Sequence, residues 1–215
     1  MTARNHRLLP FFSGLLVATL VISNTIGGRL FDVGPLTLSA ATLIFPFSYL
    51  LGDVLTEVYG YAASRRVVWT GFAALLLMTF FYQLVVWIPA SPVTRYPEAY
   101  VQIFSQTPRI VMASITAYLT GEFINSFVVA KLKVLQEGKL MALRFVASTV
   151  FGEFFDSCIF ILVAFGGTYP VDMLVKIILS IWLVKVLWEI VAWIKRTENE
   201  DYYDRSTDFS PFRLD

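Results

Sequence analysis

The sequence of 215 residues is poor in the side chains that build disulfides and most metal sites, with one cysteine, Cys158, and one histidine, His6. A single cysteine excludes an internal disulfide, and a single histidine excludes a metal site built from histidines. Charged residues make up only 15% of the chain, whereas soluble domains carry about 25%. The formal net charge of +1 provides no basic excess for nucleic acid. These shortages argue against a soluble enzyme, a disulfide-stabilised domain and a nucleic-acid partner.

Sequence motifs typical of enzymes are also missing, including HExxH, GxSxG, the P-loop and the dinucleotide-binding GxGxxG. Cys158 has no histidine base near it in the sequence, so we expect it to serve packing. We therefore predict no enzyme activity, no cofactor and no bound metal. One alternative stays open, because facing acids on separate helices, such as Asp53 and Asp156, would suit an intramembrane aspartyl enzyme.

The sequence is instead rich in apolar residues, which make up 57% of the chain and fall into blocks of roughly 20 residues, long enough to cross a bilayer. We predict an all-α integral membrane protein with a six-helix transmembrane domain over residues 1–196 and a polar cytoplasmic tail over 197–215. The predicted spans cover about 8–26, 40–60, 67–88, 109–131, 143–165 and 171–194.

Lysine and arginine gather at the N-terminus, in the second and fourth loops and in the tail, which places both termini in the cytoplasm. An even number of spans agrees with that arrangement. Residues 4–22 show the basic-then-apolar order of a secretory leader, but Val21-Ile22-Ser23-Asn24-Thr25 lacks a small-x-small cleavage pattern. We therefore expect this segment to be retained as the first membrane helix.

Three polar segments interrupt the apolar blocks: Gly121-Glu122-Phe123-Ile124-Asn125-Ser126, its near copy Gly152-Glu153-Phe154-Phe155-Asp156-Ser157, and Gly52-Asp53-Val54-Leu55-Thr56-Glu57. Acids within a membrane span cost several kcal/mol unless they face a partner or water, and they usually mark a functional site. Spacings of three or four residues place the polar groups of each segment on one helix face. The glycine before each first acid permits close approach of another helix.

The same segments lie at a common depth in their spans, which predicts one shared site. Glu122, Asn125, Glu153 and Asp156 offer acceptors for a cation or for a ligand rich in N–H donors, and Asn24 adds a polar group at a comparable depth. The repeated motif suits an inverted repeat of three helices plus three. Two basic residues have simpler explanations: Lys185 suits a structural pair with Glu189, and Arg109 suits snorkelling to the interface.

The ordered set of motifs resembles the queuosine precursor transporter family of bacteria and archaea, also filed as vitamin uptake transporters. The resemblance rests on residues 51–61 with Arg65-Arg66, on segments 121–126 and 152–157, and on the tail at Tyr203-Asp204-Arg205 and 208–212. It implies a six-helix inner-membrane protein that imports a 7-deazapurine, typically 7-cyano-7-deazaguanine or its aminomethyl relative, for tRNA queuosine. It also implies a likeness to the substrate-binding subunits of energy-coupling-factor transporters.

With that ligand, Glu122 or Glu153 would accept the guanine-like edge, and Asp156 with Asn125 would meet the ring or its 7-substituent. Asp53 and Glu57 would serve an inner gate or proton coupling. We expect a secondary transporter whose partners are its small-molecule substrate and the lipid bilayer. An ATP-driven transporter subunit with another substrate, a scaffold subunit and a homo-oligomer all remain open alternatives.

Overall fold

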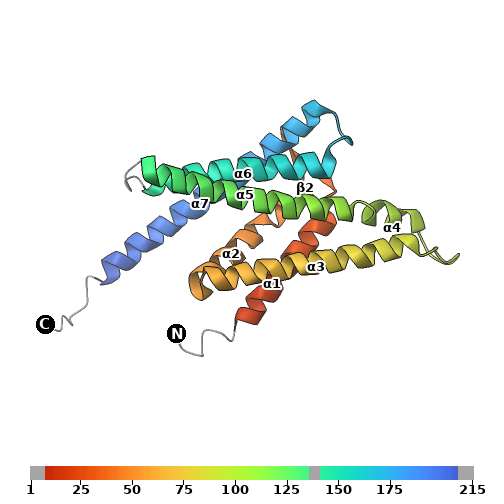
Figure 1. The fold of residues 1–215 in the computed structure, drawn as a ribbon, viewed down its shortest axis with the longest axis horizontal. Helices are drawn as coiled ribbons and strands as arrows, with labels where there is room; N and C mark the ends of the chain where they lie inside the picture. Colours follow the sequence, from red (N-terminus) through yellow and green to blue (C-terminus); the bar gives the residue numbers. More distant parts are fainter. Residues whose placement is uncertain (1–7, 136–140, 208–215) are drawn as a thin grey trace.

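The computed structural model describes residues 8–135 and 141–207, and within them the chain is mostly helical (Figure 1). The predicted family motif at 208–212 lies outside the described residues. The α-helices are α1 (Leu9–Ile26), α2 (Phe45–Tyr59), α3 (Tyr61–Trp87), α4 (Pro97–Phe104), α5 (Thr107–Leu135), α6 (Met141–Phe165) and α7 (Val171–Thr207). A short 3-10 helix, η1 (Ala40–Leu43), precedes α2.

Three of the described helices are long and apolar enough to cross a membrane: α1, α3 and the Ala147–Phe165 part of α6. Helix α2 is short, with 15 residues, whereas α5 and α7 have 29 and 37 residues and carry charged side chains within their length. The helix positions correspond in order to the predicted blocks, with different ends. In particular, α7 continues to Thr207, into the segment expected to be tail.

The second predicted block is divided in the structure. The predicted span 40–60 comprises η1 and α2, and Pro46 lies in the first turn of α2. A proline is tolerated there because the first amides of a helix have no intrahelical acceptor. Helix α2 ends at Tyr59, and the φ of 82° at the next residue, Gly60, lies in the region that favours glycine. Helix α3 begins at the next residue, so the expected second loop is a single-residue turn.

A β-hairpin follows α1 and is a correction to the all-α prediction. Strands β1 (Leu30–Val33) and β2 (Leu36–Ser39) pair antiparallel, with Leu30 opposite Ser39. Strand β2 packs against α7, where Leu38 joins a buried apolar cluster with Ile177 and Ile181. The amide of Thr37 also donates to Ser180 Oγ at 3.2 Å. The hairpin therefore ties the first part of the chain to the last helix.

The helices form two groups that can be followed in Figure 1: α1 to α3 pack on one another, and α5 to α7 pack in the order α5, α6, α7. Helices α5 and α6 make the most extensive contact and run antiparallel. Arg109 at the start of α5 reaches the end of α6, donating from Nε to Val163 O at 2.6 Å and from its guanidinium to Gly166 O. The snorkelling expected for Arg109 is thus replaced by capping of the last carbonyls of α6.

Candidate functional site

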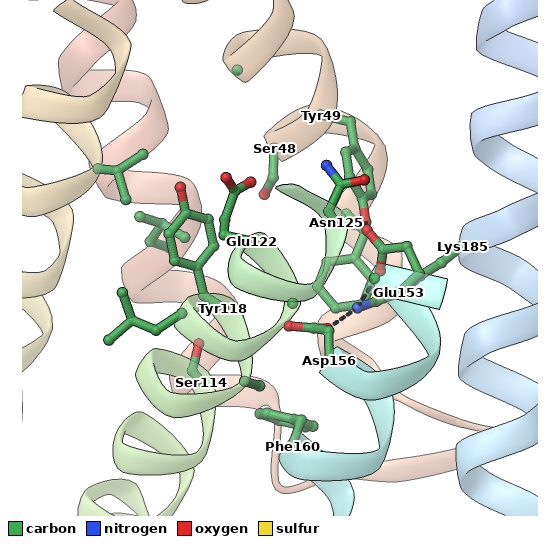
Figure 2. A pocket seen from close by; sticks show the side chains of 18 of the residues that line it. Ser48, Tyr49, Ser114, Tyr118, Glu122, Asn125, Glu153, Asp156, Phe160 and Lys185 are labelled. Atoms are coloured by element: carbon green, nitrogen blue, oxygen red, sulfur yellow. Dashed lines mark hydrogen bonds and ion pairs between the residues drawn. The ribbon is translucent and has the colours of Figure 1, made fainter. Parts of the chain in front are cut away.

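A cavity of about 690 Å³ lies between the two groups of helices, and α1, α2, α3, α5, α6 and α7 all contribute to its wall. That volume is within the range of small-molecule sites, roughly 300–1,000 Å³. The structure brings six of the predicted site residues to this one wall: Asn24, Asp53, Glu122, Asn125, Glu153 and Asp156. The side chain of Glu57 lies outside the described residues. Figure 2 shows the α5 and α6 members of the set facing the same space.

The two motif glycines bring α5 and α6 into backbone contact. A Cβ atom at Gly121 would lie 3.1 Å from Asp156 Cβ and 3.3 Å from Gly152 O. Reciprocally, a Cβ at Gly152 would lie 3.1 Å from Asn125 Cβ and 3.2 Å from Gly121 O. Each motif therefore contacts the other in the same way, as in a local two-fold arrangement. This close approach, which glycine favours, sets the polar side chains of both helices side by side.

Lys185 on α7 reaches across to the α6 motif (Figure 2). Its Nζ lies 2.9 Å from Glu153 Oε2 and forms an ion pair with Asp156 as well. The Lys185 side chain is only 5% exposed. Tyr49 on α2 donates its hydroxyl to Glu153 Oε1 at 2.7 Å, so three helices meet at this carboxylate. A buried ammonium between two carboxylates satisfies the rule that interior charges are paired.

The matching acid of the α5 motif has a different environment. No hydrogen bond or ion pair joins Glu122 to another side chain in the described ranges, and its carboxylate turns into the cavity, away from Lys185 (Figure 2). Ser48 and Tyr118 line the wall near it. Glu122 therefore presents acceptor atoms to whatever occupies the cavity.

Buried amide and hydroxyl oxygens add to this acceptor surface. Asn24 is buried and uses its Nδ2 to donate to Leu20 O at 2.9 Å, but its Oδ1 has no partner among the described residues. Asn125 Oδ1 and Ser157 Oγ are likewise buried without a described partner, and all three residues line the cavity. An unpartnered buried polar atom costs about 1–3 kcal/mol, which a ligand donor or a water could recover.

Aromatic rings form part of the same wall. Tyr118 packs edge-to-face on Phe72, with ring centroids 5.4 Å apart, and both line the cavity. Phe160 of α6 and Phe45 of α2 also lie on the wall. The cavity thus combines flat apolar surfaces with carboxylate and amide acceptors, a combination suited to a planar, N–H-rich ligand.

Sequence reasoning missed two residues of this wall, Lys185 and Tyr49. Lys185 was matched with Glu189, its neighbour one turn along the same helix, whereas the structure gives it partners on α6. Its position within the predicted span 171–194 was the available signal. Tyr49 lies one helical turn before Asp53, which places both on one face of α2.

Comparisons with known proteins agree with this architecture. The chain is 30% identical over 158 residues to a Bacillus subtilis (strain 168) protein named "Probable queuosine precursor transporter", covering 73% of this chain and 69% of that protein. No solved structure matches it. Residues 39–194, which hold every cavity acid named above, match the family described as "Putative vitamin uptake transporter". The match covers most of the chain, which therefore belongs to that family of membrane transporters.

Proposed function

We propose that this protein imports a 7-deazaguanine precursor of queuosine across the bacterial or archaeal inner membrane. The observation that carries the proposal is the carboxylate of Glu122, which has no ion-pair partner among the described residues and is set in a cavity of about 690 Å³ between helices. The name of the Bacillus subtilis relative points to the same class of ligand. In this proposal the protein acts as a secondary transporter, and the small molecule enters the cavity from one side of the membrane and leaves from the other.

The wall offers the contacts that such a ligand needs. A guanine-type edge carries two adjacent N–H donors, and one carboxylate can accept both in parallel. Glu122 is the better candidate for that role, since Glu153 already accepts from Tyr49 and pairs with Lys185. The oxygens of Asn24 and Asn125 are available for further ring N–H groups. Stacking on the ring of Tyr118 or Phe160 would complete the site.

The proposed membrane arrangement has six spans with both termini in the cytoplasm. Helices α5 and α7 cross despite their charged residues because several of these, Glu122 and Lys185 among them, face the cavity and not lipid. The grouping of α1–α3 and α5–α7 is what an inverted repeat of three plus three would produce. Asp53 lines the same cavity, which is compatible with a role in gating or proton coupling. A likeness to energy-coupling-factor subunits belongs to the same proposal.

The test is queuosine formation in tRNA of a bacterium that cannot make the precursor and is fed low 7-cyano-7-deazaguanine. We expect the wild-type protein to restore queuosine and Glu122→Gln to abolish restoration at equal membrane abundance. Glu98→Gln is the matched control, because Glu98 lies on the exposed helix α4, away from the cavity. No restoration by a wild-type protein present in the membrane would contradict the proposal.

A second candidate function rests on the family description, which names vitamin uptake. In that case the chain would be the substrate-binding subunit of an ATP-driven transporter, with a different planar ligand in the same cavity. Purified protein in liposomes separates the two candidates, because uptake without any added ATPase excludes the need for a driving module.

A further inference from the structure

Lys185 is a charge that the proposed function does not use. Its contacts in the described part of the chain lie within the wall: Glu153 and Asp156 accept from its ammonium, and the ring of Phe45 lies 4.9 Å from Nζ. An ammonium has three N–H donors, and two carboxylates with one aromatic face account for all of them. The Lys185 side chain is itself buried.

The consequence is that Lys185 offsets one of the two negative charges on α6 and occupies one oxygen of each acid. A ligand ammonium that approached Glu153 or Asp156 would be attracted by the acids but repelled by Lys185, so the internal cation weakens the attraction that the two acids alone would exert. Glu122, on the neighbouring helix, has no such counter-ion among the described side chains and accepts neutral N–H donors freely.

We propose that Lys185 is a built-in counter-cation that tunes charge selection, so that the α6 side of the cavity binds a cationic substituent less strongly, relative to a neutral one, than its two acids alone would. The proposal rests on the proposed function and makes it more specific. Within the deazaguanine class, the substituent at position 7 differs in charge: a cyano group is neutral and an aminomethyl group is an ammonium at pH 7. Lys185 would therefore be a specificity-determining residue that acts through Glu153 and Asp156.

Two substitutions change the charge of this wall in opposite directions. Lys185→Met removes the internal cation and leaves two acids to attract an external one. Asp156→Asn removes one acid and leaves Lys185 paired with Glu153, so the wall becomes less attractive to a cation. The measured quantity is the ratio of affinities for 7-aminomethyl-7-deazaguanine and 7-cyano-7-deazaguanine, obtained by titration of the purified full-length protein in lipid nanodiscs.

Relative to wild type, the ratio should rise at least about tenfold in Lys185→Met and fall about tenfold in Asp156→Asn, as expected for charges a few ångströms apart at an intermediate dielectric. The double variant Lys185→Met/Glu153→Gln restores the original charge balance and should return the ratio close to wild type. Lys176→Met is the matched control, because Lys176 is an exposed cation of the same helix outside the cavity wall.

The possible outcomes distinguish failure of this inference from failure of the proposed function. If both ligands bind the wild type and the ratio changes less than twofold in Lys185→Met and Asp156→Asn, charge selection by Lys185 is wrong while the deazaguanine site stands. If Lys185→Met does not accumulate, the Asp156→Asn ratio decides alone. If neither ligand binds the wild type, the proposed function fails and this inference fails with it.

Discussion

The α5 and α6 motifs are nearly the same in sequence and differ in what surrounds them. Both read glycine, glutamate, two apolar residues and then a polar residue, and their glycines contact each other reciprocally. On α6, Glu153 and Asp156 bind Lys185, and Tyr49 adds a hydrogen bond. On α5, Glu122 faces the cavity without a described counter-ion. Helix α7 therefore supplies a counter-ion to the acids of the α6 motif, whereas Glu122 of the α5 motif remains available to a ligand.

The difference indicates how one motif can serve two purposes. A buried ion pair holds α6 to α7, because separating it would leave a charge uncompensated in an apolar interior. In the α5 motif, Glu122 lacks such a pair among the described side chains, and its carboxylate remains available to a ligand. The sequence repeat alone would assign both copies the same role.

The largest effect on stability is expected from removing Lys185, the cation that pairs with the acids of the α6 motif. Lys185→Met leaves two partly buried acids without a counter-charge; losing one partner of a fully buried pair costs about 3–5 kcal/mol, which is the upper bound here. We expect a correspondingly lower free energy of unfolding in a denaturant titration of the purified protein in detergent. Lys176→Met should stay within about 0.5 kcal/mol of wild type, as surface substitutions do. Equal stability of the two variants would show that the ion pair does not hold the helices together.

Neutralising Glu122 and Glu153 one at a time tests whether the α5 and α6 motifs have different roles. Glu122→Gln should lower affinity for 7-cyano-7-deazaguanine by about 1.5–3 kcal/mol, the range for hydrogen bonds to charged groups, and leave thermal stability unchanged. Glu153→Gln should do the reverse, lowering the melting temperature more than the affinity, because its oxygens serve Tyr49 and Lys185. Melting curves with and without ligand measure both quantities. Equal profiles for the two variants would contradict the division of roles.

The contact between the two motifs can be tested through its glycine. Gly152→Leu would force a side chain against Asn125 and the backbone of Gly121, and overpacking of this kind costs about 1–3 kcal/mol. We expect a lower melting temperature and less monodisperse protein on size exclusion. Gly14→Leu on α1 is the matched control, because no atom lies within 4 Å of a Cβ placed there. Similar behaviour of both variants would argue against the close approach.

The smallest effect on stability is expected from removing the Tyr49 hydroxyl, which joins α2 to Glu153 of the α6 motif. Tyr49→Phe removes one interhelical hydrogen bond, and such bonds average about 0.6 kcal/mol and reach about 1.7 kcal/mol in membrane proteins. Denaturant titration against Tyr96→Phe, an exposed tyrosine between α3 and α4, measures the difference. A loss well above that of Lys185→Met would overturn the ranking.

Much of this architecture follows from local sequence patterns. Apolar blocks locate the long helices, and the recurrence of acids at one depth indicates residues that the structure places on one cavity wall. Glycine before each acid predicts close helix approach because the absence of a side chain lets the two backbones come near each other. These inferences succeed since each depends on periodicity or on the size of a single residue.

Other features depend on contacts between distant segments, and local patterns missed them. The hairpin at residues 30–39 is stabilised partly by packing on α7, and α2 begins where Pro46 can enter a first turn. The partners of Lys185 lie about thirty positions earlier in the chain, whereas Glu189 offers an equally plausible neighbour at helical spacing. Only the relative placement of α6 and α7 distinguishes these alternatives.

The reciprocal glycine contact, together with the Arg109 cap on α6, also limits how this molecule can move. Two helices in backbone contact, fastened at one end by a guanidinium, should travel as a single rigid body. Spin labels on the outer faces of α5 and α6 should therefore keep their separation with and without ligand, and a change would refute the idea. Any alternation between outward and inward access would then require α1–α3 to move relative to α5 and α6.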